Sequence, residues 1–266
     1  MAEYLGQLGQ LVELGCASTE RVQSGPRYFP QVSVEGRRSV QLLPTPPRTW
    51  ELSWSVAHRG EVAALADFVT GGWGPGPWHW VSLAAQRGNM LTPAQAGCRD
   101  RRSGSSALFT DGGPMVTADG SVAPTSVVSA LTSGWSSIWT TIPALPGTPV
   151  TFSADVEGVG ARIIIAARSA SGATLATAGA SASIPTVSRV SVTITPPPGT
   201  VSVEVGVQST VARLTRPQVT WTRSAVPFAR GAGCRAAVVE AGPEELIALW
   251  DGVDYRSTGF TVMEVF

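Results

Sequence analysis

The two histidines are the residues of this chain with the widest chemical range, and they stand far apart. His58 and His79 have aromatic or charged neighbours, and neither has a second histidine four residues away with a glutamate beside it. Zinc proteases need that spacing because it places two imidazoles on one helix face. Neither a G-x-S-x-G elbow nor a P-loop occurs in the sequence. We therefore expect no catalytic, cofactor-binding or metal-binding residue, and we expect that the protein is not an enzyme.

The cysteines give no sign of a disulfide framework or a metal centre. Cys16, Cys98 and Cys234 are odd in number and widely spaced. A disulfide scaffold or a zinc site would show closely spaced pairs. Because free cysteine behaves as a small hydrophobic residue, we expect these side chains to serve in packing.

Paired carboxylates are a second possible source of chemistry, since glycosidases place two of them on either side of a sugar bond. Asp155 and Glu157 are two residues apart, so they share one face of a predicted strand. Glu244 and Glu245 stand in a predicted turn. Neighbouring acids on an exposed strand are far more often solvated than catalytic, and we interpret these pairs in that way.

Three tryptophans point to a binding function. Trp135, Trp139 and Trp221 could stack on a sugar ring, because an exposed aromatic side chain presents a flat apolar face to carbohydrate C–H groups. Trp139 and Trp221 lie within alternating strand patterns, which favour a core position over sugar stacking. Trp135 stands in the loop at 133–136, so it is the one that we expect to be exposed.

The stretch T-G-G-W-G-P-G-P-W-H-W-V at 70–81 is the densest in aromatic, glycine and proline residues. A dinucleotide-binding loop would need a helix N-terminus after its glycines, whereas prolines and a strand follow here. We interpret Trp73, Trp78 and Trp80 as a structural junction. Trp78 and Trp80 are two residues apart, so both rings should be buried on one strand face while His79 points to the other.

Charge and composition exclude several classes of partner. The net charge is zero, and all 19 basic residues are arginines scattered along the chain, so no electrostatic footprint for a nucleic-acid backbone exists. The most apolar run, at 163–167, is far too short to span a bilayer, and the N-terminus lacks a basic segment followed by an apolar one. We expect a soluble protein that binds neither nucleic acid nor membrane and is not exported by a signal of its own.

Hydrophobic periodicity predicts a mainly β chain with one short helix. In the first hundred residues we expect an extended segment over 1–14, a hairpin over 28–42, a strand over 48–56 with Trp50, Leu52, Trp54 and Val56 on one face, and a helix over 61–69. At the end of the chain we expect strands over 236–240, 246–250 and 260–266, with a turn at 242–245.

The middle of the chain has a different character. Short strands rich in Thr, Ser and Val are predicted over 138–142, 150–156, 162–167, 173–177, 190–194, 201–207 and 218–221. Such a series suggests an antiparallel β-sandwich of the jelly-roll kind. The final 40 or so residues are unlikely to fold alone, so we expect 1–100 and 226–266 to form one discontinuous β-rich domain with 105–224 inserted into it. We interpret the charged run at 99–106 as a solvated linker between these two parts.

These motifs resemble a known family. G-R-R-S-V at 36–40, P-R-T-W at 47–50, the stretch at 70–81 and N-M-L-T-P at 89–93 resemble minor tail proteins of siphophages of actinobacteria, in layout the distal tail protein. The insert resembles jelly-roll carbohydrate-binding modules through P-G-T-P-V-T-F-S-A at 146–154 and S-R-V-S-V-T at 188–193.

The resemblance implies a tail-tube-like ring domain and a structural function. Copies of the chain would form a ring, usually hexameric, that joins the tail tube protein to the tail-tip hub protein, with the inserted domains facing outward. The protein would belong to the tip of the virion tail and be assembled in the host cytoplasm. An alternative is an adhesin that acts through the insert and binds a host cell-surface glycan.

Overall fold

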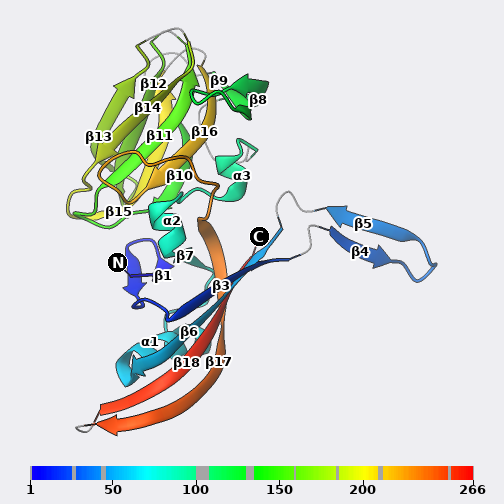
Figure 1. Cartoon of the computed structure of the whole chain (residues 1–266), viewed down its shortest axis with the longest axis vertical. Helices are drawn as coiled ribbons and strands as arrows, with labels where there is room; N and C mark the ends of the chain where they lie inside the picture. Colours follow the sequence, from blue (N-terminus) through cyan, green and yellow to red (C-terminus); the bar gives the residue numbers. More distant parts are fainter. Residues whose placement is uncertain are drawn as a thin grey trace. The chain divides into compact units, whose positions relative to one another are not determined.

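The computed structural model describes residues 2–25, 28–42, 46–99, 108–129, 135–158, 160–183, 186–208, 212–250 and 253–265. The fold is mainly β, as predicted (Figure 1). The elements of the two ends of the chain are β1 (Tyr4–Gln7), β2 (Gln10–Glu13), β3 (Thr19–Ser24), β4 (Tyr28–Val32), β5 (Arg38–Leu42), β6 (Arg48–His58), α1 (Arg59–Thr70), β7 (Trp78–Val81), β17 (Cys234–Trp250) and β18 (Val253–Glu264). Those between are α2 (Leu83–Arg87), α3 (Pro93–Ala96), β8 (Leu108–Val116), β9 (Val122–Ser129), β10 (Ser136–Pro143), β11 (Val150–Glu157), β12 (Arg162–Ser169), β13 (Thr174–Ser181), β14 (Ser188–Ile194), β15 (Thr200–Gln208) and β16 (Ala212–Thr220).

The chain divides into two compact units. The first unit comprises 1–7, 11–80 and 234–266, and the second comprises 8–10 and 81–233. The boundaries therefore fall at 80/81 and 233/234, whereas the sequence placed them near 100 and 226. The interpretation of these units as a ring domain and an inserted carbohydrate-binding-module-like domain stays a prediction.

A seven-stranded sheet forms the first unit, in the order β2-β1-β7-β17-β18-β6-β3. Residues that alternate along β6 and β18 pair across the two strands, for example Leu52 with Phe260 and Trp50 with Val262, so their side chains share one face. These four side chains are all buried. The apolar side of α1 packs in the same cluster through its buried Val62, Leu65 and Phe68, so this helix covers the apolar face of the sheet.

A buried ion pair joins the end of β18 to the start of β6. The guanidinium of Arg48 donates to both carboxylate oxygens of Glu264, at 2.8 and 2.9 Å. The two side chains are only 10% and 9% exposed, and the guanidinium also lies 4.9 Å from the ring centre of Trp50. Two parallel N–H···O bonds fix the geometry of both partners, which ties the last strand to the centre of the sheet.

The prediction that Val56 shares the buried face of β6 is wrong, because β6 contains a bulge. Trp54 pairs with Thr258 and Ala57 with Arg256, so β6 has one more residue than β18 between these pairs. The extra residue shifts the alternation of side chains by one position. Ala57 consequently enters the core, while Val56 is 59% exposed.

The predicted turn at 242–245 is also wrong. These residues lie within a single strand, β17, which runs from Cys234 to Trp250. A bulge between Ala241 and Glu244 takes up Gly242 and Pro243 without ending the pairing with β18. A Cβ on Gly242 would lie 2.8 Å from the carbonyl oxygen of Gly259. The bulge therefore brings the two backbones into close approach, which glycine permits.

The predicted hairpin at 28–42 is present as β4 and β5, which form a separate two-stranded sheet. All residues from 30 to 40 are exposed. A second exposed ribbon is the far end of β17, where residues 243–249 are all exposed. We call β4–β5 the short hairpin and residues 244–250 with 253–258 the end of the long hairpin.

Two antiparallel sheets make up most of the second unit, in the orders β10-β15-β12-β13 and β14-β11-β16-β9-β8. Their buried positions include alternating residues of β11, β12 and β15, among them Phe152, Ile163, Ile165, Val203 and Val205, each with 0% exposure. The sequence pattern does not predict strands β8 and β9 or the short helices α2 and α3. Helix α3 is marked by a capping box, in which Thr92 and Gln95 bond reciprocally to each other's backbone N–H. The predicted linker at 99–106 lies outside the described residues except for Arg99.

Candidate functional site

Two of the three tryptophans considered for sugar stacking lie in the core of the second unit. Trp139 has 0% exposure and Trp221 has 9%. The indole N–H of Trp221 donates to the carbonyl of Pro143 at 3.2 Å. Neither ring therefore offers an open face to a sugar, and the core interpretation applies to both.

Trp135 is half-buried and lies beside a polar cluster whose members come from separate strands. The guanidinium of Arg168 lies 5.9 Å from its ring centre. Arg168 in turn donates to both carboxylate oxygens of Glu204 at 2.8 Å, and the hydroxyl of Ser137 also donates to Glu204. An aromatic face beside an Arg–Glu pair has the components of a carbohydrate subsite, because it combines stacking with directional hydrogen bonds.

The predicted carboxylate pair on β11 does not form an open two-acid site. Asp155 is buried with 1% exposure between two arginines, with the Arg189 guanidinium at 3.6 Å and that of Arg216 at 3.8 Å. Burial raises the pKa of Asp155, while Arg189 and Arg216 act against that change. Glu157 forms its own ion pair with Arg213 at 2.6 Å. Each acid therefore has its own cationic partner, and Asp155 belongs to a charge network inside the unit.

That network extends to the turn between β8 and β9. Arg216 lies 2.6 Å from Asp119, and the hydroxyls of Thr117 and Ser121 both donate to the same carboxylate. These donors, with Arg216 first among them, lower the pKa of Asp119. The guanidinium of Arg216 also lies 4.8 Å from the ring centre of Phe228. The network therefore joins β11, β14, β16 and the β8–β9 turn of the second unit around Asp155 and Asp119.

Trp78 and Trp80, two residues apart on β7, both lie in the core of the first unit. Trp78 is 6% exposed and Trp80 1%, and both belong to the core beneath α1. The ring of Phe68 lies between two tryptophans, with ring centres 5.3 Å from Trp78 and 5.5 Å from the half-exposed Trp73. The glycine-rich loop thus connects α1 to β7, and Trp73 and Trp78 pack against the core side of α1.

His79 is partly buried on the other side of the strand. Burial and the neighbouring positive charge of Arg235 lower its pKa from 6.5 to about 4. Its Nδ1 is buried and makes no hydrogen bond within the part of the chain that the structure describes. The imidazole is therefore neutral at physiological pH.

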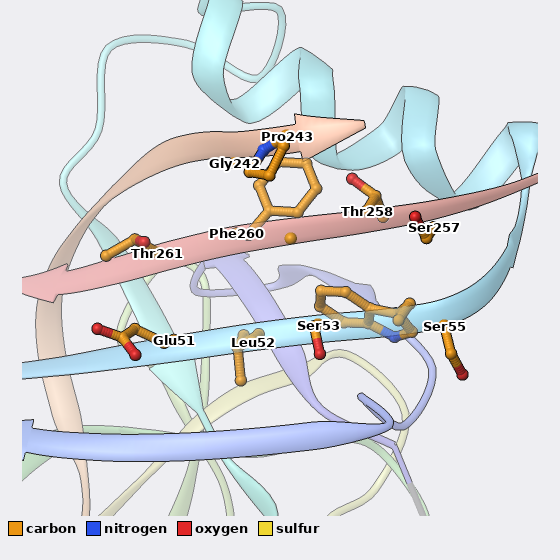
Figure 2. A pocket seen from close by; sticks show the side chains of 12 residues that line it. Glu51, Leu52, Ser53, Ser55, Gly242, Pro243, Ser257, Thr258, Phe260 and Thr261 are labelled. Atoms are coloured by element: carbon orange, nitrogen blue, oxygen red, sulfur yellow. The ribbon is translucent and has the colours of Figure 1, made fainter. Parts of the chain in front are cut away.

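A pocket of about 400 Å³ lies beside the bulge of β17, lined only by residues of β6, β17 and β18. Figure 2 shows Phe260 pointing toward Gly242 and Pro243 at the wall of this pocket. Several polar groups of the lining are already engaged: Ser53 hydrogen-bonds Thr19, and Glu51 accepts from the amide of Gln23. The lining contains neither histidine nor cysteine.

Several of the most exposed apolar side chains of the first unit lie on the two hairpins. On the short hairpin, Val32 is 66% exposed and Val40 58%. At the end of the long hairpin, Leu246, Ile247 and Leu249 are 52%, 50% and 68% exposed. Apolar side chains that protrude from a narrow ribbon of two strands are a common feature of association surfaces.

The cysteines and the other ionisable residues form no metal centre in the described ranges, where no three His, Cys, Asp or Glu side chains gather. Cys98 and Cys234 are buried free thiols, and burial raises the pKa of each to about 12. Cys16 is exposed. Among the described residues, no helix is long and apolar enough to cross a membrane.

Comparisons with known proteins show a distant structural likeness to a phage tailspike domain. No family model matches the chain, and no curated protein matches its sequence. A solved structure similar to it is the enzymatically active domain of tailspike protein 4 of bacteriophage CBA120, with 14% identity and a TM-score of 0.40. The match covers 50% of this chain and 21% of the tailspike chain, about a fifth of that protein's length.

This finding corrects the prediction that the protein is not an enzyme. That prediction rested on missing sequence motifs alone, whereas the similar tailspike domain is described as enzymatically active. Motifs such as G-x-S-x-G identify particular families, and pairs of carboxylates from separate strands leave no such mark. The absence of such motifs therefore does not exclude an enzymatic activity.

Proposed function

We propose that the protein is a structural component of a phage tail tip, of the distal-tail type. In this proposal, copies of the first unit form a ring that joins the tail tube to the tail-tip hub, and the second unit is displayed on the outside. The observation that carries the proposal is the pair of exposed hairpins on the first unit, each with apolar side chains in solvent. A lone two-stranded hairpin is at best marginally stable in water, so a partner surface would stabilise it.

The path of the chain supports the same proposal. The sheet of the first unit is completed by β17 and β18, which follow the whole second unit in the sequence. A domain placed between two strands of a finished sheet can vary without interrupting the surfaces that join neighbouring copies. Closed rotational symmetry would then limit growth to a ring.

Electron microscopy of the purified full-length chain tests this function. We expect closed rings, hexameric if the family resemblance holds, at micromolar concentration. Labelling of the protein in virions should place it at the end of the tail tube. A protein that stays monomeric at all concentrations and is missing from tails would refute the proposal.

A glycan-binding adhesin is the second candidate, favoured by the cluster of Trp135 with Arg168 and Glu204. The test is binding of the full-length chain to host cell walls and to a glycan array. We expect Trp135→Ala to abolish such binding and Trp73→Ala to leave it unchanged, since Trp73 is an exposed tryptophan of the other unit. Equal binding by both variants, or none by the parent chain, would exclude this role for Trp135.

A further inference from the structure

The apolar face of the long hairpin continues beyond the helix that covers the sheet. Side chains alternate along β18, so Asp254 and Arg256 share a face with the buried Phe260. Leu246 pairs with Arg256 and Leu249 with Asp254, which places both leucines on that same face. The face that forms the core under α1 is therefore solvent-exposed at the end of the long hairpin.

The short hairpin has an apolar face of its own. Pro30 pairs with Val40 and Val32 with Arg38, and Pro30 and Val32 lie two residues apart on β4. These four side chains consequently share one face, on which three apolar residues adjoin one positive charge. All four are exposed.

The two faces differ in charge. The end of the long hairpin carries Glu244, Asp254 and Arg256 on its leucine face, and Arg256 forms ion pairs with both acids. Two acids and one base give that face a net charge of −1. The short hairpin contributes Arg38 beside its valines, a charge of +1. Each face thus carries exposed apolar side chains, and the two faces have opposite net charges.

We infer that the valine face of the short hairpin of one copy docks on the leucine face at the end of the long hairpin of the next copy. This inference rests on the proposed ring. Two different patches that bind each other make a heterologous interface, which gives a ring when the rotation closes. Val32 and Val40 lie against Leu246 and Leu249, and Arg38 lies beside Asp254.

Cross-linking of mixed variants tests the contact directly. In a Cys16→Ser background, full-length Val32→Cys and Leu249→Cys proteins are assembled separately and as an equal mixture, then treated with a short bismaleimide. The two remaining native thiols are buried. We expect dimers of one copy of each variant in the mixture and none in either variant alone. The double variant should give a ladder of products that ends at the ring's copy number.

The outcomes separate the inference from the proposed function. Cross-links within one variant alone would mean that a hairpin contacts its own counterpart, which overturns the inference. Rings that form without any cross-link in the mixture overturn the inference and leave the ring function standing. Failure of the parent chain to form any ring refutes the proposed function itself.

Charge substitutions provide an independent measurement. Val32→Asp and Leu249→Asp should each weaken assembly at least tenfold in sedimentation velocity, because each buries a charge in the contact. Val122→Asp is the matched control, since Val122 is 69% exposed on the second unit and lies outside both hairpins. An equal loss of assembly in the control, or full assembly of both hairpin variants, would contradict the inference.

Discussion

His79 makes the stability of the first unit depend on pH in a way that can be calculated. Its pKa is lowered from 6.5 to about 4 by burial, with a further contribution from Arg235. The folded state therefore prefers neutral imidazole, and the unfolded state binds more protons between these two values. The stabilisation is fully present above pH 6.5 and is lost as the pH falls toward 4.

The size of the effect follows from linkage. Since one pKa unit corresponds to about 1.4 kcal/mol, this shift removes about 2 kcal/mol of unfolding free energy at pH 5 and about 3 kcal/mol at pH 4, relative to pH 7. A glutamine at position 79 keeps a polar side chain of similar length without this titration. We expect the stability of His79→Gln to fall less than that of the parent chain by these amounts.

Hydrogen exchange at increasing urea concentration provides the assay, read from peptides that contain β7. Reporting on that strand separates the first unit from the second, which is necessary in a chain of two units. His58→Gln is the control, because it removes the only other histidine. A second variant, Arg235→Gln, should raise the pKa of His79 and reduce the loss at pH 5. The reasoning is refuted if the parent chain and His79→Gln lose equal stability between pH 7 and pH 5.

Three further predictions concern the cysteines, the buried ion pair and the bulge of β17. Under native conditions one thiol, that of Cys16, should react with Ellman's reagent, while the two buried cysteines react only after unfolding; fast reaction of all three would contradict their burial. Glu264→Gln should cost about 3 kcal/mol of unfolding free energy because it leaves the guanidinium of Arg48 buried without its counter-charge, whereas Glu51→Gln, at a half-exposed acid, should cost under about 1 kcal/mol in the same urea titration. Gly242→Ala should lower the melting temperature, since its Cβ would lie 2.8 Å from a backbone oxygen of β18; an unchanged melting temperature would show that the bulge relaxes freely.

Periodicity was sufficient to locate elements whose pattern is regular. The alternation at 48–54 and the helical spacing at 61–69 predict β6 and α1 within a few residues of their observed ends. The spacing of Trp78 and Trp80 likewise predicts their burial. In each case a local repeat and a single apolar face carry the information, so neighbouring residues suffice to identify the structure.

The polar clusters could not be predicted because their members come from separate strands. Arg168 and Glu204 are brought together by the pairing of β12 with β15, and Asp155 meets Arg189 through the pairing of β11 with β14. The residues next to each of these side chains in the sequence do not indicate which distant residue it pairs with. The same limit applies to Trp135, whose polar neighbours became visible only when the strands were paired.

Bulges are the other reason that the pattern fails, and they connect the fold to the proposed assembly. Each bulge adds one or more residues to one strand and shifts its side-chain alternation. A bulge between Leu246 and Ala248 places Leu249 on the same face as Leu246, where unbroken alternation would put it on the opposite face. An uninterrupted strand would therefore divide the two leucines between the faces of the ribbon. With the bulge, both leucines lie on one face, beside the acids that give this face its negative charge, so a single docking partner can contact all of them.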